Sequence, residues 1–217
     1  MQQKPLHKIL FRYCPLCHDA GVPFYKNTFF QCLNCGGIFR PEEHLPHPGK
    51  EKARYEQHNN DVDDSAYRSF VSPIFDAVKE HCSRSGKGLD FGAGTGPVIS
   101  RMLKEAGYSL EQYDPFFFNN PRVLQAAYDY IVCCEVMEHF HNPDDEFALL
   151  ERLLKPGGRL FCMTDLYRDD IDFRHWQYKN DLTHVFIYRK KTVQWIRDNI
   201  GFSSAEIHKR LITFHKL

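Results

Sequence analysis

The sequence contains no apolar run near the roughly 20 residues that a membrane-spanning helix requires. It also has no excess of either charge, because 28 Lys and Arg side chains balance 28 Asp and Glu side chains. Residues 1–10 lack the apolar core of an export signal, and no repeats stand out. These absences argue against a membrane protein, an exported protein and a non-specific nucleic-acid binder. We therefore expect a cytoplasmic protein of 217 residues, long enough for one α/β domain and a small appendage.

Three glycines at alternate positions are the most informative feature that is present. Gly92, Gly94 and Gly96 follow a short apolar segment, residues 87–91, and precede a predicted helix. This layout brings bare backbone to the carboxyl end of a strand, where open α/β sheets bind nucleotides. A dinucleotide fingerprint would need a further glycine where Pro97 stands, and the Lys-Ser/Thr ending of a P-loop is missing. Taken alone, the loop is also compatible with a tight turn between a strand and a helix.

Later segments add polar residues at the ends of further predicted strands. Asp114 ends a strand predicted over residues 109–113, and its carboxylate could accept hydrogen bonds from both hydroxyls of a ribose. Residues 130–134 form an apolar run typical of a strand buried on both faces. A helix predicted from Asn142 stops at the Lys-Pro-Gly-Gly segment, residues 155–158, before another strand.

Residues 65–217 resemble class I S-adenosylmethionine-dependent methyltransferases, including the small-molecule and ubiquinone-pathway enzymes. The resemblance implies an α/β fold with a Rossmann-like sheet that ends in an antiparallel pair around residues 205–208 and 211–214. It implies S-adenosylmethionine as cofactor, held by residues around the glycine loop and at the strand ends. These are Asp90, Gly92, Ala93, Gly94, Gly96, Asp114 and Glu135. One departure is that the third strand has room only near residues 123–126, with no helix before it.

Four cysteines near the N-terminus occur as two C-x-x-C pairs, fourteen residues apart. They are Cys14, Cys17, Cys32 and Cys35. Two such turns can complete a tetrahedral zinc site, and four thiolates leave no open position for catalysis. Disulfides are the alternative, although nothing marks the chain for export. We expect a structural Zn²⁺ in a zinc ribbon over residues 1–46, a linker over 47–65 and the methyltransferase domain over 66–217.

The segment after the fifth predicted strand is the densest in reactive side chains. The resemblance implies that it lines the pocket of the methyl acceptor. His184 is the first candidate for a base and His139 the second, while Asp181 could orient His184. Trp176 and Tyr178 could contact the acceptor. Each of these residues could also be purely structural, with an imidazole bonded to a loop carbonyl or an aromatic ring anchored in the core.

The sequence thus predicts methyl transfer to a small-molecule or carrier-linked acceptor, with the methylated atom and the oligomeric state open. One alternative is an RNA methyltransferase that uses the ribbon to bind its substrate. Another is a non-catalytic adaptor that binds the cofactor as a sensor. Methylation of a protein side chain is not distinguished from the first hypothesis by sequence.

Overall fold

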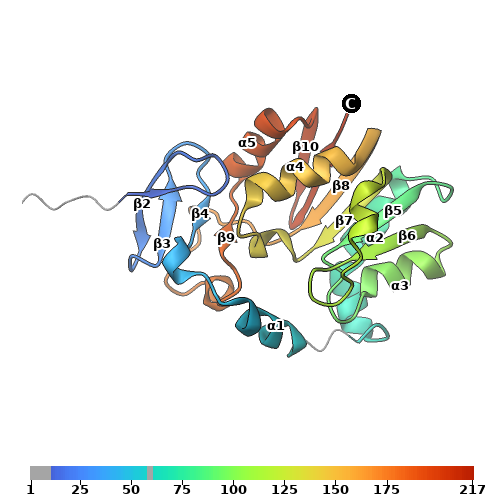
Figure 1. The fold of residues 1–217 in the computed structure, drawn as a ribbon, viewed down its shortest axis with the longest axis horizontal. Helices are drawn as coiled ribbons and strands as arrows, with labels where there is room; N and C mark the ends of the chain where they lie inside the picture. Colours follow the sequence, from blue (N-terminus) through green and yellow to red (C-terminus); the bar gives the residue numbers. More distant parts are fainter. Residues whose placement is uncertain (1–10, 58–60) are drawn as a thin grey trace, which may run out of the picture.

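The structure, a computed structural model, describes residues 11–57 and 61–217. Two segments lie outside these ranges. They are residues 1–10, which we expected to belong to the ribbon and to lack an export signal, and residues 58–60 of the expected linker. Within the described ranges the chain forms a five-stranded sheet, ordered β1-β2-β3-β4-β9, and a six-stranded sheet, ordered β10-β11-β8-β7-β5-β6. Figure 1 shows the smaller sheet at one end of the molecule and the larger sheet, with its helices, at the other.

The six-stranded sheet is parallel except for its last strand pair. Its strands are β5 (Lys87–Phe91), β6 (Ser109–Tyr113), β7 (Tyr128–Cys134), β8 (Leu154–Met163), β10 (Ser204–His208) and β11 (Leu211–His215). Strand β5 pairs in parallel with both β6 and β7, and β7 pairs in parallel with β8. Strand β11 runs antiparallel to β8 and to β10. The predicted antiparallel ending of the sheet is therefore confirmed.

Helices cover both faces of this sheet, which explains why its central strands are apolar throughout. The helices are α2 (Ser65–His81), α3 (Val98–Glu105), α4 (Pro143–Leu153) and α5 (Lys190–Ile200). Alternate residues of β7 face opposite layers: Ile131 and Cys133 belong to the core cluster that contains α4 and α5. Tyr130 and Val132 belong to the cluster that contains α2 and α3. Each fully buried large side chain of this kind contributes about 1.5–3 kcal/mol to folding.

The smaller sheet contains one strand from the far end of the sequence. Its strands are β1 (Arg12–Tyr13), β2 (Ala20–Tyr25), β3 (Phe29–Cys32), β4 (Ile38–Phe39) and β9 (Phe186–Ile187). Strand β9 pairs antiparallel with β4 through Ile38–Ile187 and Phe39–Phe186. The rings of Phe39 and Phe186 stack with centroids 6.5 Å apart. The N-terminal sheet and the methyltransferase-like sheet therefore share one continuous core.

The region between β6 and β7 corrects one expectation. The short third strand expected near residues 123–126 is wrong: the described chain forms a 3₁₀ helix there, η2 (Pro121–Gln125). Pro121 cannot donate to a sheet ladder, and the Asn120 side chain accepts a hydrogen bond from the Arg122 amide at 3.3 Å. This capped turn replaces the strand, so the sheet ends at β6.

Two further segments differ in detail from the expectation. The stretch expected to be a linker contains helix α1 (Pro48–Glu56), which begins after His47, whose Nδ1 accepts a hydrogen bond from the Gly49 amide. The expected stop at residues 155–158 is already part of β8, which starts directly after α4. Gly157 permits this course of the chain because its φ is +78°. The other short helices are η1 (Glu42–His44), η3 (Met137–His139) and η4 (Gln177–Asn180).

Candidate functional site

The glycine loop between β5 and α3 is shaped by backbone contacts with the neighbouring strands. Gly92 has φ +81°, and its amide donates to the Tyr113 carbonyl at 2.8 Å. A Cβ at position 92 would lie 2.5 Å from both γ-carbons of Val136, so only glycine fits there. Gly94 has φ +62°, and its amide donates to Oδ2 of Asp114 at 3.0 Å. The loop therefore turns its bare backbone toward the end of β6.

Two buried aspartates hold this loop from different sides. Asp90 accepts a hydrogen bond from Ser100 Oγ on α3 at 2.7 Å, and burial raises its pKa to about 6. Asp114 also accepts from the amides of Phe116 and Phe117, at 2.8 and 3.1 Å. The Asp114 carboxylate thus fixes both the glycine loop and the turn that follows β6.

The loop opens onto a cavity of about 570 Å³, a size typical of small-molecule sites. All seven residues predicted to contact the cofactor line this one cavity. They are Asp90, Gly92, Ala93, Gly94, Gly96, Asp114 and Glu135. His139 and His184 line the same cavity, so the structure brings the predicted cofactor residues and the predicted bases together.

Glu135 occupies a constrained position at the end of β7. Its φ is +53°, in the region that disfavours residues other than glycine, and its amide donates to the Met163 carbonyl at 2.8 Å. One carboxylate oxygen accepts from the Arg210 guanidinium, while Oε1 is buried without a hydrogen-bond partner among the described residues. Burial, together with the neighbouring Glu138 carboxylate, raises the pKa of Glu135 to about 8.

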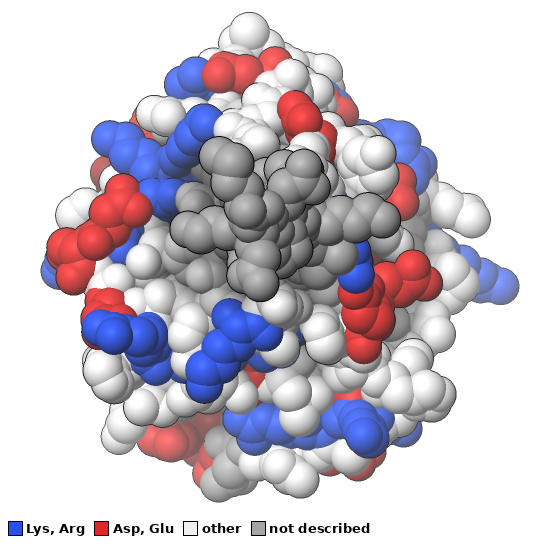
Figure 2. Space-filling view, turned by 90° about the vertical axis from the view of Figure 1, so that its left-hand side faces the viewer, with Lys and Arg blue, Asp and Glu red and all other residues white. Residues whose placement is uncertain are grey.

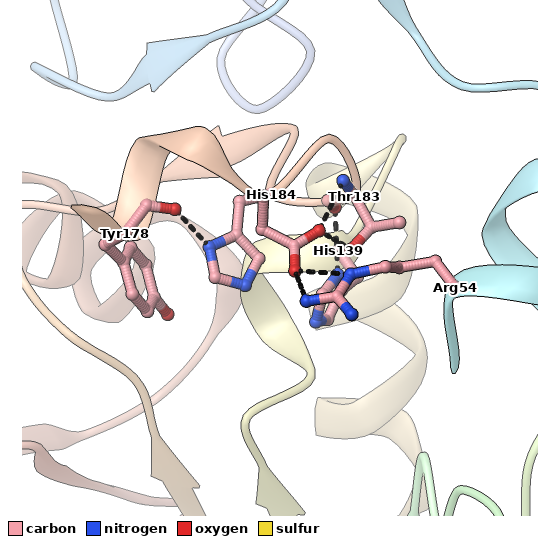
Figure 3. Close-up of polar contacts among 6 residues, drawn as sticks. Arg54, His139, Tyr178, Thr183 and His184 are labelled. Atoms are coloured by element: carbon pink, nitrogen blue, oxygen red, sulfur yellow. Dashed lines mark hydrogen bonds and ion pairs between the residues drawn. The ribbon is translucent and has the colours of Figure 1, made fainter. Parts of the chain in front are cut away.

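Both predicted bases are bonded to backbone carbonyls through Nδ1. His139 Nδ1 lies 2.8 Å from the Thr183 carbonyl oxygen, and His184 Nδ1 lies 2.7 Å from the Tyr178 carbonyl oxygen. Because a carbonyl only accepts, each neutral ring carries its proton on Nδ1 and its lone pair on Nε2. The two rings are 4.9 Å apart between centroids, and burial lowers the pKa of His139. Figure 3 shows His184 beside Tyr178.

Asp181 ties the acceptor segment to helix α1. It accepts hydrogen bonds from the Thr183 amide and hydroxyl, at 2.9 and 2.6 Å, and from Arg54 at 3.0 and 2.8 Å. Figure 3 shows Arg54 reaching toward the turn that contains Thr183. Burial works against ionisation of Asp181, yet these hydrogen bonds hold its pKa well below the usual range. Asp181 therefore caps the turn that positions His184.

Trp176 and Tyr178, which sequence analysis assigns to the acceptor pocket, are not among the described residues that line the cavity. The Tyr178 hydroxyl bonds Thr164 Oγ1 and donates to Glu138 Oε1, both at 2.6 Å. Trp176 stacks on the Tyr178 ring with centroids 5.0 Å apart, and it packs against the aromatic cluster beneath the N-terminal sheet. Burial raises the pKa of Glu138, the partner of Tyr178, to about 7.

This arrangement of strands, glycine loop and cavity matches known methyltransferases. The profile of the methyltransferase domain family covers residues 57–207. The chain belongs to this family.

Curated relatives of this methyltransferase-domain chain include ubiquinone biosynthesis O-methyltransferases. The one from Sodalis glossinidius is 32% identical over 90 residues, which cover 40% of this chain and 36% of the relative. The one from Vibrio atlanticus is 30% identical over 77 residues, 36% of this chain and 32% of the relative. The similarity thus spans about a third of the length of these relatives.

Solved structures confirm the predicted fold of the methyltransferase domain. One is 1,6-didemethyltoxoflavin-N1-methyltransferase from Burkholderia thailandensis, with a TM-score of 0.54 and 16% identity, covering 85% of this chain and 97% of that one. Another is an O-methyltransferase family protein from the same organism, with a TM-score of 0.53 and 14% identity, covering 76% and 61%. At these identities the likeness concerns the fold alone.

Sequence reasoning missed several residues of the methyltransferase site. Pro48 and Glu51 of α1 line the cavity, and buried Glu51 pairs with His141 at 2.9 Å. The mixed charge of residues 46–65 suggested a linker and concealed this helix. Glu138 was available as a signal, because it stands three residues after Glu135 at the end of a buried strand.

The four N-terminal cysteines of the methyltransferase-domain chain form a second candidate site. Their sulfur atoms all lie within 4.8 Å of one another, with Cys14–Cys35 at 3.6 Å and Cys17–Cys32 at 3.2 Å. Both distances are too long for a disulfide, whose sulfurs lie about 2.05 Å apart. Sulfurs at about 2.3 Å from one tetrahedral zinc would lie nearly 4 Å apart, so the donor set fits that ion.

Proposed function

We propose that this protein is an S-adenosylmethionine-dependent methyltransferase that acts on a small-molecule or carrier-linked acceptor. The observation that carries the proposal is one cavity lined by the glycine loop, by Asp114 and by two histidines with Nε2 lone pairs. The relatives and the shared fold support the same function.

The described residues fit this cofactor. Asp114 stands at the tip of β6, where its carboxylate would hold the ribose hydroxyls. The backbone of Gly92, Ala93 and Gly94 would face the ribose and methionine parts, and the buried Glu135 Oε1 offers an acceptor for an ammonium group. When bound, the cofactor supplies an activated methyl group on a sulfonium leaving group.

The chain's own contribution to methyl transfer is to position the acceptor and to remove a proton. The cavity must hold the nucleophile about 3 Å from the methyl group, in line with the breaking bond and away from water. His184 would accept the acceptor's proton at Nε2, because Tyr178 fixes the proton of the ring on Nδ1. His139 could do the same, and Asp181 would position His184 through the turn that it caps.

We further propose that Cys14, Cys17, Cys32 and Cys35 hold a structural Zn²⁺. Structural zinc binding contributes about 10–16 kcal/mol in isolated finger peptides. In the described chain, Cys82, Cys133, Cys134 and Cys162 are free thiols, which supports a reducing, cytoplasmic location. No helix of the described residues is long and apolar enough to cross a membrane.

RNA is a less suitable acceptor for this cavity. No Lys or Arg lines it among the described residues. Figure 2 shows Lys and Arg interspersed with Asp and Glu over the end that carries the small sheet. A nucleic-acid face would be expected to gather positive charge.

A transfer screen with a radiolabelled methyl group would test the proposed function. Purified protein and labelled S-adenosylmethionine would be added to cell extract separated into metabolite, RNA and protein fractions. We expect label in the metabolite fraction. Label only in RNA or only in protein would show that the acceptor is RNA or protein and not a small molecule. No label in any fraction, despite measured cofactor binding, would favour a cofactor-sensing adaptor.

A further inference from the structure

Arg40 of the small sheet binds two carbonyl groups of the acceptor segment, residues 176–184. Arg40 follows β4 directly, and its amide donates to the Val185 carbonyl at 2.8 Å. Its guanidinium donates from Nε to the His184 carbonyl at 3.3 Å and from Nη2 to the Lys179 carbonyl at 3.2 Å. One planar, charged group therefore joins the two ends of the turn formed by residues 179–184.

Packing in the small sheet holds this guanidinium in place. Its central carbon, Cζ, lies 4.3 Å from the centroid of the Phe29 ring, a distance at which a cation and an aromatic face attract each other. Phe29 on β3 is buried and belongs to the aromatic cluster that contains Tyr167 and Phe173. Burial lowers the pKa of Arg40 and the Asp181 carboxylate opposes this shift, so the group stays charged. A charged donor forms stronger hydrogen bonds to the two carbonyls than a neutral donor would.

The turn that Arg40 closes also orients the His184 ring. His184 lines the cavity, and its Nδ1 lies 2.7 Å from the Tyr178 carbonyl oxygen (Figure 3). That carbonyl belongs to the peptide bond that precedes Lys179, whose own carbonyl accepts from Arg40. The carbonyl of His184 accepts from the same guanidinium. Arg40 thus fixes the backbone at both partners of the hydrogen bond that orients the His184 ring.

We propose that Arg40 is a positioning residue for methyl transfer, because it holds the turn at residues 179–184 in the shape that orients His184 in the cavity. The inference rests on the proposed function, in which His184 is the first candidate for the base. Arg40 is not among the described residues that line the cavity, so it acts through the backbone of the turn. The small sheet is then part of the acceptor half of the site and not a separate appendage.

The orientation of the His184 ring can be measured by NMR without knowledge of the acceptor. In protein with isotope-labelled histidine nitrogens, the ring-nitrogen shifts at about pH 8, where an ordinary imidazole is neutral, distinguish a protonated from an unprotonated Nδ1. The His184 signal is the one that a His184→Gln variant lacks. We expect a protonated Nδ1 in the parent protein and a shift toward the other tautomer in Arg40→Met, because the Tyr178 carbonyl is no longer held beside the ring. An unprotonated Nδ1 in the parent, or unchanged shifts in Arg40→Met, would overturn the inference.

Hydrogen exchange of backbone amides tests the turn itself. Arg40→Met should raise the exchange rates of the amides at residues 183–185 at least about 10-fold, the factor expected for the loss of one hydrogen bond from a charged donor. Arg12→Met is the matched control, because Arg12 lies in the same sheet but donates to Glu43 and lies over the Phe30 ring. It should leave these rates within about 3-fold of the parent values. Equal rates in the two variants would reject the assignment.

A second variant separates the role of the guanidinium from a general loss of the fold. If Arg40→Met does not retain the thermal midpoint of the parent protein, Arg40→Lys replaces it in both measurements. Lysine keeps the charge and a long stem but lacks the planar fork that reaches two carbonyls. Arg40→Lys should show the same changes to a smaller extent, and parental values in both measurements would reject the assignment.

Methyl transfer and cofactor binding distinguish this inference from the proposed function. With labelled S-adenosylmethionine and the metabolite fraction of cell extract, Arg40→Met should lower the transfer rate at least about 10-fold, because a positioned base contributes about 10²–10⁴-fold. The dissociation constant of S-adenosylhomocysteine should stay within about 3-fold of the parent value, since the glycine loop and Asp114 follow β5 and β6. A transfer rate equal to that of Arg12→Met would reject only this inference. A parent protein that does not bind S-adenosylhomocysteine would reject the proposed function, and the ring shifts and exchange rates would still decide whether Arg40 holds the turn.

Discussion

Replacing Asp114 by asparagine should weaken cofactor binding while it leaves most of the fold intact. The Asp114 carboxylate accepts three backbone hydrogen bonds, from Gly94, Phe116 and Phe117. Asparagine keeps one oxygen that accepts from the Phe116 and Phe117 amides. Its side-chain NH₂ group then faces the Gly94 N–H, and because both groups are donors this hydrogen bond is lost. Alanine would leave all three amides without an acceptor, so asparagine is the sharper test.

The magnitude follows from the change in hydrogen-bond type. A hydrogen bond to a charged group contributes about 1.5–3 kcal/mol and a neutral one about 0.5–1.5 kcal/mol. Losing the charge opposite two ribose hydroxyls should therefore cost about 2–3 kcal/mol of binding free energy. The dissociation constant of S-adenosylhomocysteine should rise about 30- to 150-fold.

Calorimetric titration with S-adenosylhomocysteine measures this change directly. Glu111→Gln is a matched control on the same strand, since Glu111 bonds Tyr128 and does not line the described cavity. It should change the constant less than about 3-fold. An Asp114→Asn protein that melts like the parent and binds equally well would show that the carboxylate does not hold the ribose.

Three further predictions follow from other contacts. Gly92→Ala and Gly157→Ala both place alanine at a positive φ, but only the new Cβ at position 92 would clash with Val136. Gly92→Ala should therefore lower the free energy of unfolding in urea by about 1–3 kcal/mol more than Gly157→Ala, and equal losses would contradict this. The pKa of Glu138 is raised to about 7, so its contribution to stability is complete below about pH 4.5 and is lost as the pH rises through 7. Glu138→Gln should therefore reduce the fall in thermal midpoint between pH 5 and 8, and an unchanged fall would count against a neutral Glu138. Cys32→Ser should release zinc and lower the thermal midpoint of the whole chain, and a midpoint equal to that of the parent would refute a structural role for the metal.

Much of the larger sheet could be predicted because its signals are local. The strand bounds 87–91 and 109–113 agree with β5 and β6, and helix α5 ends at Gly201, whose φ of +111° suits the residue after a helix. Apolar runs and glycine positions depend on neighbours close in sequence. The cofactor half of the candidate site depends on the same local features, since it consists of strand ends and one loop.

The acceptor half could not be predicted to the same extent, because its contacts are distant in sequence. Arg54 donates to Asp181 from α1, a helix whose polar composition had predicted a linker. Tyr178 turns its hydroxyl toward buried Glu138, a pairing that no periodicity reveals. A 3₁₀ helix that begins at Pro121 replaces the expected third strand, and the short segment between β6 and β7 did not distinguish these two structures.

The pairing of β4 with β9 has a consequence for how the chain folds during synthesis. The N-terminal sheet needs Ile187 opposite Ile38, so it stays incomplete until β9 has left the ribosome. Until then β4 presents an unpaired edge of apolar residues. Cysteine thiolates that bind metal early would keep the two C-x-x-C turns folded until β9 pairs with β4. We expect released chains that are truncated before residue 186 to aggregate or to recruit chaperones, and chains that include β9 to do so less.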